Sequence, residues 1–448
     1  MGQTVKPRDP LRWRVFAFLT ILGLALMANF QNSAERSFTR EEDLIPIDFP
    51  VFYLGGKVAL QRGAIPLYYP PTDRSRGYTL LYENAPEATP WAQLGRANGF
   101  PEILRFTNPP FTALLMAPLA MLPWQWAYLL WQFIIVILTA AALFLTLKLL
   151  PSKLKLETFT LIFAALCFFH PFTSNLTFGQ VNVSILFLWT LGVYLLKQGR
   201  PMASGLCLAL GTALKVSPVA AVPLLALRRQ WRWLAGYLAG IIAASAVSIW
   251  RLGWQTNLTW LTVIYPDISS GVGNNYNRSF AGVVDSLVGP RYFATFADST
   301  QWAVPPGLGL FEKICSLAIG LGFLFWCWRN RKGAKGLIDQ LILLPLITLL
   351  AAPFSWQGHF LLAVLPLAYL WARAQETTSG ELLALYLSTL ILGTELPMYV
   401  AAYSPWANPY FIIVANALWP LAICALIWVG MRMSIRSQVV EPQLGAAI

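Results

Sequence analysis

Long apolar runs recur along the whole chain and constrain its fold more than any other feature. About 20 apolar residues in a helix are needed to cross a hydrocarbon layer of ~30 Å. We assign spans near residues 13–30, 124–148, 157–172, 180–197, 202–214, 217–227, 233–250, 307–328, 337–352, 357–372, 381–400 and 409–431. With 57% hydrophobic and only 12% charged residues, the chain is too apolar for a soluble domain. The sequence therefore predicts an all-α polytopic membrane protein with a single transmembrane domain over residues 1–448.

The basic residues predict how these spans are oriented. If the N-terminus is inside, the inner segments hold 19 Lys and Arg against 6 Asp and Glu, and the outer segments hold 13 against 14. Cytoplasmic loops of membrane proteins carry an excess of Lys and Arg. We therefore place both termini in the cytoplasm and the chain in a plasma (inner) membrane. The net charge of +12 comes from short clusters between spans, so it does not indicate nucleic-acid binding.

The segment from Pro109 to Pro123 is apolar but differs from the spans. It is only 15 residues long and contains four prolines, which interrupt helices. A full span here would also move the following basic clusters to the outside. We interpret it as a short interfacial or re-entrant helix on the outer side, with a true span as the alternative.

Two outer loops are long enough to hold folded material, at residues 31–108 and 251–306. Loops of this length are usually functional or disordered, and their many aromatic residues argue against disorder. We expect several short interfacial helices in the first loop. The five cysteines all fall within proposed spans, which argues against a disulfide framework: Cys167, Cys207, Cys315, Cys327 and Cys424.

Asp48 is the candidate catalytic residue of the first outer loop. It follows the first span and heads an apolar stretch, so its carboxylate is placed to accept a proton at the membrane surface. It also precedes Pro50, and an N-cap of a short helix is the alternative role. The nearby run Glu41-Glu42-Asp43 is better explained as a solvated acidic turn than as a cation site. With two histidines and no outer cysteine pair, no metal site is expected.

Lys215 lies between two short apolar runs, at the tip of a predicted hairpin on the outer side. A lysine left at the bilayer centre would cost about 2.5–3.5 kcal/mol. It becomes tolerable if the ammonium reaches the headgroup level or pairs with an anion such as a lipid phosphate. Because the tip faces the same side as Asp48, we favour the phosphate ligand over a simple membrane anchor. His359, Arg278 and Asn182 are further candidate partners of an anion, although His359 could also be a hydrogen-bonded structural histidine.

Several motifs resemble those of one known family. They begin in the first outer loop and continue through the central spans: Asp48…Tyr53…Gly63…Leu67-Tyr68, Asn108-Pro-Pro-Phe111, Ala117-Pro-Leu119, Gly179-Gln-Val-Asn182, Gly205…Gly211…Lys215…Pro218, Arg228-Arg-Gln-Trp-Arg232, Asn277-Arg-Ser279 and Ser355…His359…Leu365-Pro366. Together they resemble glycosyltransferase family 87, the polyprenyl-phosphate-mannose-dependent mannosyltransferases of the GT-C superfamily. The block from Gly179 to Arg232 is the most specific, and the last 75 residues add little.

The resemblance implies a GT-C-type bundle of about 12 transmembrane helices. It also implies an enzyme that moves a sugar, with mannose favoured, from a polyprenyl-phosphate donor to a hydroxyl of a lipid-linked or glycan acceptor outside the cytoplasm. No cofactor and no bound metal are implied, because the donor carries its own leaving group. The motifs add residues that contact the donor or its phosphate, Gln180 and Asn182 beside Lys215, His359 and Arg278. They also add residues that bind the acceptor or support the site, Tyr53, Asn108 and Asn277.

Two other classes of protein share some of these features. A polytopic transporter or lipid flippase also has many spans and buried polar residues. Such proteins usually contain paired internal repeats, and none is visible here. A non-catalytic scaffold would leave Asp48 and Lys215 without a role. Glycosyl transfer is therefore the favoured function. The acceptor, the identity of the transferred sugar and the oligomeric state do not follow from the sequence.

Overall fold

The computed structural model describes residues 10–38, 48–69, 88–101, 103–150, 156–271, 277–288, 304, 306–331, 334–394 and 409–445. Five helices in these ranges are long and apolar enough to cross a membrane. They are α1 (Pro10–Phe38), α5 (Trp124–Lys148), α11 (Trp231–Leu252), α15 (Pro306–Arg329) and α20 (Pro409–Gly445). Three of them begin at a proline, whose fixed φ and missing N–H are tolerated in the first turn. The described residues are largely helical, and these five helices are consistent with the predicted membrane protein.

The remaining predicted spans coincide with shorter apolar helices. These are α6 (Leu156–Cys167), α7 (His170–Phe178), α8 (Asn182–Lys197), α9 (Pro201–Leu214), η4 (Ser217–Ala220), α10 (Ala221–Leu227), α16 (Ala334–Ala351), η8 (Gln357–Ala363), α17 (Val364–Ala372) and α18 (Ser379–Leu392). The pair α6 and α7 would pass as one span, bent by 61°. Length and composition thus identify five or six spans in the described residues, and the count of twelve stays a prediction.

The bend between α6 and α7 positions one wall of the later site. It occurs where Pro171 follows His170, and Phe169 is extended, with φ −80° and ψ 110°. The nitrogen of proline carries no hydrogen, so Pro171 cannot donate to a carbonyl of the preceding turn, and the helix is interrupted there. The backbone N–H of His170 instead donates to the carbonyl of Gly393 at 2.8 Å, which ties the bend to the end of α18.

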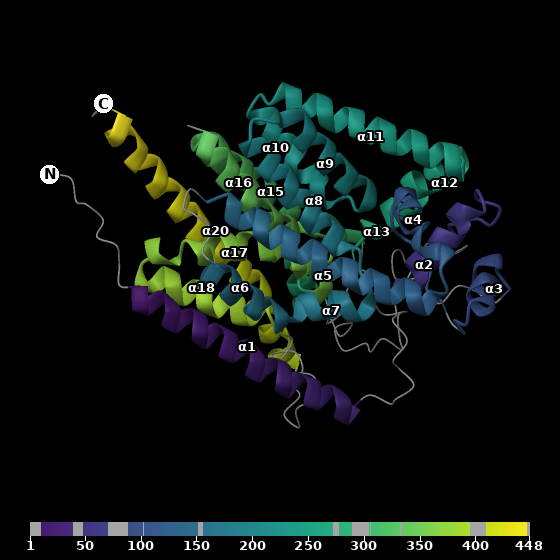
Figure 1. Cartoon of the computed structure of the whole chain (residues 1–448), viewed down its shortest axis with the longest axis horizontal. Helices are drawn as coiled ribbons and strands as arrows, with labels where there is room; N and C mark the ends of the chain where they lie inside the picture. The colour runs from purple at the N-terminus through teal and green to yellow at the C-terminus, as the bar shows by residue number, and fades with distance from the viewer. Residues whose placement is uncertain are drawn as a thin grey trace.

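Short helices from residues 31–108, 109–123 and 251–306 gather at one end of the bundle (Figure 1). They are α2 (Phe49–Leu60), α3 (Pro90–Ala97), α4 (Pro110–Met116), η3 (Leu119–Met121), α12 (Trp254–Thr259), η5 (Trp260–Ile264) and α13 (Tyr265–Ile268). Figure 1 shows α2, α3, α4 and α12 at the end opposite to the start of α1 and the end of α20. The segment 109–123 contains α4 and η3, with seven and three residues. Neither is long enough to cross a bilayer.

Helices α9 and α11 pack closely because small residues line their contact. A Cβ on Gly205 would lie 2.2 Å from the carbonyl oxygen of Trp233, and one on Gly236 would lie 2.2 Å from that of Met202. Both distances are impossible for a larger side chain. Such small-residue contacts let backbones approach where the surrounding lipid offers no hydrophobic drive for association. They fix α9, and hence Lys215 at its end, against the rest of the bundle.

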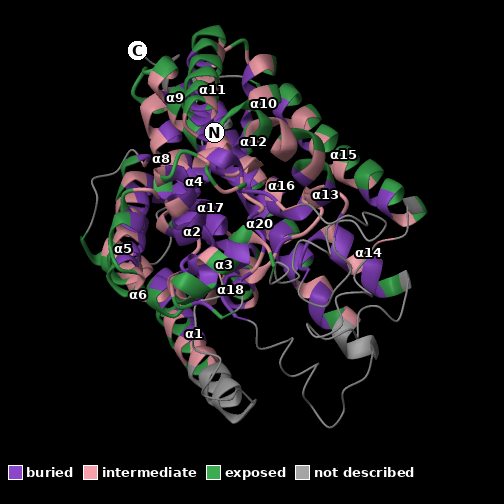
Figure 2. Ribbon diagram, turned by 90° about the vertical axis from the view of Figure 1, so that its right-hand side faces the viewer, coloured by how far each residue is buried: buried purple, intermediate pink, exposed green. Residues whose placement is uncertain are grey.

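The outer surface carries large apolar side chains. Phe133 of α5, Leu238 of α11 and Leu317 of α15 are about three-fifths exposed, at 62%, 59% and 62%. Figure 2 shows exposed positions along the outer faces of these helices, with buried residues toward the centre. Exposed apolar surface on this scale marks contact with a partner or a membrane. The pattern matches helices that face lipid on one side and the bundle on the other.

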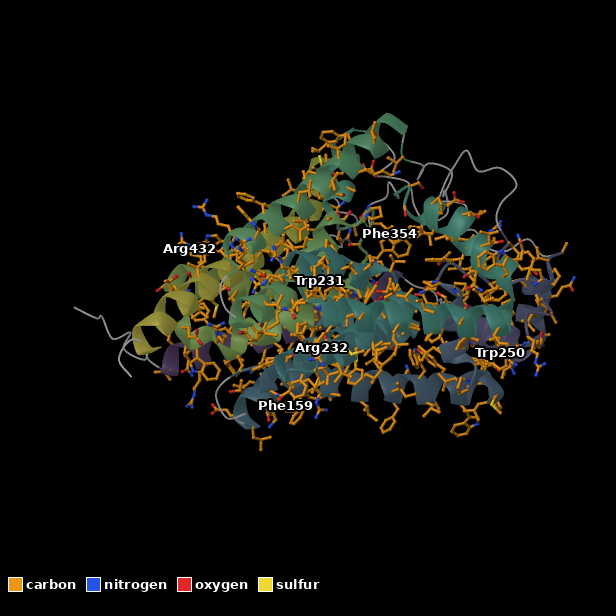
Figure 3. The ribbon with its side chains drawn as sticks, turned by 90° about the horizontal axis from the view of Figure 1, so that it is seen from above. Phe159, Trp231, Arg232, Trp250, Phe354 and Arg432 are labelled. Atoms are coloured by element: carbon orange, nitrogen blue, oxygen red, sulfur yellow. The ribbon has the colours of Figure 1, made fainter. Side chains whose placement is uncertain are left out.

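Two of the basic clusters meet at a shared end of the bundle. The ammonium of Lys197, at the end of α8, donates to the backbone oxygens of Lys148 and Leu149 at the end of α5. Figure 3 shows Arg232 and Trp250 toward opposite ends of α11, with Trp250 on the side of the short helices. Basic and aromatic residues thus lie toward different ends of α11, and which end faces the cytoplasm stays a prediction.

Candidate active site

A cavity of about 400 Å³ lies among the short helices and the ends of the longer ones. One part of its wall comes from the start of α2, residues 104–109 and the turns before α8 and after α9. The other part comes from η5, α13 and residues 348–362. Phe354, on the wall formed by the last of these segments, is labelled in Figure 3. Six of the predicted site residues line this one cavity although they are distant in the sequence: Asp48, Asn108, Gln180, Asn182, Lys215 and His359.

Asp48 stands immediately before α2, and the structure distinguishes its two predicted roles. Its backbone oxygen accepts from the N–H of Phe52 at 3.3 Å, so the residue occupies the N-cap position. Its side chain makes no capping hydrogen bond within the described part of the chain. The carboxylate lines the cavity instead, where the side chain of Gln180 donates a hydrogen bond to it. The geometry leaves the carboxylate available to a reacting group.

Desolvation shifts the pKa of Asp48 and that of Lys215 toward neutrality. Desolvation raises the pKa of Asp48 to about 6, although the hydrogen bond from Gln180 and the charge of Lys215 act in the opposite direction. Desolvation also lowers the pKa of Lys215 to about 8, opposed by the charge of Asp48. Between these values Asp48 is a carboxylate and Lys215 an ammonium. A carboxylate with a raised pKa is a better proton acceptor at neutral pH.

A break in the helical hairpin turns Lys215 into the cavity. The residue is extended, with φ −158° and ψ 130°, and ends α9 before Pro218 in η4. The carbonyl of Leu214 loses its helical partner there and accepts from the hydroxyl of Thr112 of α4 at 2.8 Å. The Lys215 ammonium donates to the side-chain oxygen of Asn182 at 2.7 Å. One neutral acceptor leaves a half-buried cation with capacity for an anionic partner.

Asn182 contacts Lys215 through its oxygen and uses its amide hydrogens elsewhere. Its Nδ2 donates to Asn175 Oδ1 at 3.2 Å and to the backbone oxygen of Gly358 at 3.1 Å. An amide nitrogen has two hydrogens, so both are engaged within the protein. Asn182 therefore holds the cation in this structure, and its predicted contact with a phosphate has no free N–H to support it.

His359 presents one ring nitrogen to the protein. Its Nδ1 lies 3.2 Å from the backbone nitrogen of Trp356, whose N–H donates to it. A neutral imidazole that accepts at Nδ1 carries its proton on Nε2. Because the side chain lines the cavity, Nε2 can donate to a ligand there. The backbone contact and the ligand contact are compatible, so the two predicted roles of His359 do not exclude each other.

Tyr53 and Asn108 were both predicted to bind the acceptor or support the site, and they differ in their position relative to the cavity. Tyr53 is buried, does not line the cavity, and donates its hydroxyl to the backbone oxygen of Leu122 at 2.9 Å. Asn108 lines the cavity, and its backbone oxygen accepts from the Tyr68 hydroxyl at 2.6 Å. The structure thus places Asn108 in the cavity lining and Tyr53, a residue of α2, outside it.

Arg278 and Asn277 lie behind the wall formed by residues 353–355. The guanidinium of Arg278 packs 4.6 Å from the ring centre of Trp419, and its Nη1 donates to Asn416 Oδ1 at 2.8 Å. Asn277 donates from Nδ2 to the carbonyl of Pro353 at 3.0 Å, and its Oδ1 accepts from the N–H of Ser355 at 3.0 Å. Asn277 therefore shapes the wall, as a supporting residue would. Arg278 does not line the cavity, so a contact with the donor phosphate stays a prediction.

Other cavity residues were not singled out by the sequence. Arg105, 9% exposed, adds a second cation to the lining. Trp260 also lines it and donates to the backbone oxygen of Thr107 at 3.1 Å. Trp260 begins η5, a π-helix, and such turns are rare and often found at functional sites. In the sequence both residues look like ordinary loop residues, a charge and an interfacial aromatic, so only their tertiary position identifies them.

No group of three or more His, Cys, Asp or Glu residues that could hold a metal ion occurs in the ranges that the structure describes. The acidic run at residues 41–43 lies outside those ranges. Within the described lining, Asp48 is the one carboxylate.

Comparison with known proteins identifies the family of the chain. The profile of glycosyltransferase family 87 matches residues 106–353, which include Asn108, Gln180, Asn182 and Lys215 but neither Asp48 nor His359. A polyprenol-phosphate-mannose-dependent alpha-(1-2)-phosphatidylinositol pentamannoside mannosyltransferase of Mycolicibacterium smegmatis is 23% identical over 334 residues, 73% of this chain and 77% of the relative.

Two proteins of Mycobacterium tuberculosis are similar as well. One carries the same description and is 25% identical over 340 residues, 73% of both chains. The other, a polyprenol-phosphate-mannose-dependent alpha-(1-2)-phosphatidylinositol mannoside mannosyltransferase, is 27% identical over 291 residues, 60% of this chain and 64% of the relative.

Proposed function

Since the chain belongs to glycosyltransferase family 87, we propose that its cavity is the active site of a membrane mannosyltransferase. The enzyme takes mannose from a polyprenyl-phosphate donor and transfers it to a hydroxyl of a glycolipid or glycan acceptor. The observation that carries the proposal is the placement of Asp48 and Lys215 in one cavity. One supplies a base for the acceptor, and the other supplies a cation for the leaving phosphate. The names of the relatives support mannose and a lipid-linked acceptor.

The proposed reaction is a single displacement at the anomeric carbon. The acceptor oxygen forms a bond to this carbon while the bond from the carbon to the phosphate oxygen breaks. The hydroxyl proton passes to Asp48, and the polyprenyl phosphate leaves with the bonding electron pair. Lys215 and the Nε2–H of His359 stabilise the charge on the phosphate. Because Asp48 is the one carboxylate in the described lining, it serves as base, and the displacement inverts the anomeric configuration without a covalent sugar–enzyme intermediate.

The charges and the position of the cavity support an extracytoplasmic active site. We propose twelve spans, with both termini in the cytoplasm and residues 31–108 and 251–306 outside. The cavity then opens at the outer headgroup level, where a lipid phosphate lies and the isoprenoid tail can remain in the bilayer. The donor carries its own leaving group, so the reaction requires no cofactor and no bound metal.

The proposed orientation predicts the labelling of single cysteines in intact cells. In a background with all native cysteines replaced by serine, Ser75→Cys and Ser299→Cys should react with a membrane-impermeant maleimide. Gln230→Cys, between α10 and α11, should react only after permeabilisation, which shows that its thiol is reactive. Labelling of Gln230→Cys but not Ser75→Cys in intact cells would reverse the proposed orientation.

The pKa shifts predict a bell-shaped dependence of kcat/KM on pH. Asp48 must be deprotonated to accept a proton, so kcat/KM should rise with pH through about 6. Lys215 must be protonated to bind the phosphate, so kcat/KM should fall through about 8. In the profile of kcat, the alkaline limb should move to higher pH, since a bound phosphate dianion stabilises the ammonium. A profile that is flat between pH 5 and pH 9 would contradict these two roles.

The transfer itself is tested with purified protein in detergent or liposomes. We expect radiolabelled mannose to pass from polyprenyl-phosphate mannose into a lipid-extractable or glycan product when a mannolipid acceptor is present. Free polyprenyl phosphate should form in the same amount. Movement of intact donor between the leaflets of liposomes, with no sugar transferred to any acceptor, would instead indicate a lipid flippase.

A further inference from the structure

We propose that Asn175 positions the two phosphate-binding groups of the cavity, although it touches neither substrate. The inference rests on the proposed function, because it gives Lys215 and His359 a donor phosphate to bind. Asn175 is fully buried on α7 and does not line the cavity. It acts through two neighbours, Asn182 and Gly358, and each of these leads to one of the two groups.

All polar atoms of the Asn175 amide are used within this cluster. Its Nδ2 donates to the carbonyl of Pro171 at 2.6 Å and to that of Gly358 at 2.8 Å. Its Oδ1 accepts from Nδ2 of Asn182 at 3.2 Å. A carbonyl accepts but never donates, so the two backbone oxygens fix which end of the Asn175 amide faces them. The orientation of this side chain is therefore set by the backbone.

The orientation of Asn175 in turn sets that of Asn182. Because Asn175 presents its oxygen, Asn182 must present its nitrogen, and its own oxygen is left facing Lys215 at 2.7 Å. In the opposite orientation, the N–H groups of Asn182 would face the ammonium of Lys215. Both groups are donors, so no hydrogen bond could form between them. Oxygen and nitrogen of an amide occupy nearly the same space, so shape alone does not prevent the flip. Asn175 prevents it.

The same cluster holds the turn that carries His359. The carbonyl of Gly358 accepts from both asparagines, at 2.8 Å and 3.1 Å. His359 is the next residue, and its ring is held by the N–H of Trp356. Two amides from α7 and α8 thus fix the start of η8 relative to the end of α9. One hydrogen-bond network of buried asparagines therefore supports both Lys215 and His359, and Asn175 is its central residue.

The test is a double-mutant cycle on donor affinity, measured as equilibrium binding of radiolabelled polyprenyl-phosphate mannose. Asn175→Ala should weaken binding about tenfold, since a hydrogen bond to a charged group loses its geometry. In a Lys215→Ala background the same change should weaken binding by about threefold or less, because only the contribution through His359 remains. Equal effects in both backgrounds would show that Asn175 does not act through Lys215.

A matched control separates positioning from a general loss of stability. Gln340 of α16 is also fully buried, and its amide donates to two backbone oxygens, those of Cys327 and Asn330, each at 3.2 Å. It does not line the cavity. Gln340→Ala should lower thermal stability as Asn175→Ala does, with donor affinity unchanged. If Asn175→Ala does not fold, Asn175→Asp preserves the side-chain volume but removes the donors, and it should weaken donor binding at least as much.

The outcomes distinguish this inference from the proposed function. If Lys215→Ala weakens donor binding but Asn175→Ala in a folded protein does not, the positioning role is wrong and the donor site stands. If Lys215→Ala itself leaves donor binding unchanged, the assignment of the phosphate site fails, and the positioning role with it.

Discussion

The Asp48→Asn variant is expected to lose turnover by a factor of about 100 or more while it still binds the donor. A sugar hydroxyl is a weak nucleophile near neutral pH, and a positioned general base contributes about 10²–10⁴-fold to such a step. The amide keeps the size of the carboxylate but cannot accept the proton. Turnover is measured with saturating labelled donor, and donor affinity is measured separately by equilibrium binding.

The same variant tests the alternative role of Asp48. Asparagine caps a helix about as well as aspartate, so a purely capping Asp48 predicts nearly normal turnover for Asp48→Asn. The side chain makes no capping hydrogen bond among the described residues, so we expect α2 and the thermal stability to be unaffected. Near-normal turnover would exclude Asp48 as the base. Attention would then move to Glu42 and Asp43, which lie outside the described ranges.

The Lys215→Ala variant is expected to weaken donor binding about tenfold or more and to lower kcat as well. The ammonium contacts the phosphate in the bound donor, and it stabilises the charge that develops as the phosphate leaves. Lys215→Arg should keep part of the activity, because a single-point contact depends more on charge than on shape. The test is to measure donor affinity and kcat for both variants and to compare them with the wild type.

A second lysine provides the control for this experiment. Lys57 of α2 packs 5.2 Å from the ring centre of Tyr53 and does not line the cavity. Lys57→Ala should leave donor affinity unchanged. Because the charge of Lys215 lowers the pKa of Asp48, residual activity of Lys215→Ala should also need a higher pH than that of the wild type. Unchanged donor affinity in Lys215→Ala would leave only a membrane-anchoring role for this residue.

The sequence predicted the helical class and the position of the elements well, because hydrophobicity depends on composition alone. Helices occur at every predicted span, and the proline-rich segment 109–123 is broken as expected. The number of crossings does not follow from apolar content, since α9, α16 and α18 are shorter than a full span. Apolar content does not distinguish a helix that crosses the bilayer from one that is buried in the bundle.

The candidate site could be predicted only in part. The charges of Asp48 and Lys215, and their predicted position on the same side of the membrane, identified both as candidate site residues. The family motifs identified Gln180 and His359. The roles of the amides were not predictable, because an asparagine can donate or accept depending on the end that faces its neighbour. Asn182 was expected to donate to a phosphate, yet its hydrogens are held by Asn175 and Gly358. Arg105 and Trp260 reach the cavity through tertiary contacts that no local pattern indicates.

The most direct measurement is an experimental structure of the Asp48→Asn protein with polyprenyl-phosphate mannose bound. The variant should bind the donor without consuming it, so the intact substrate is captured. We expect the phosphate oxygens within about 3 Å of Lys215 Nζ and His359 Nε2. The anomeric carbon should face residue 48, with space between them for one acceptor hydroxyl. A phosphate bound away from Lys215, or a sugar turned away from residue 48, would contradict the assignment of this cavity as the active site.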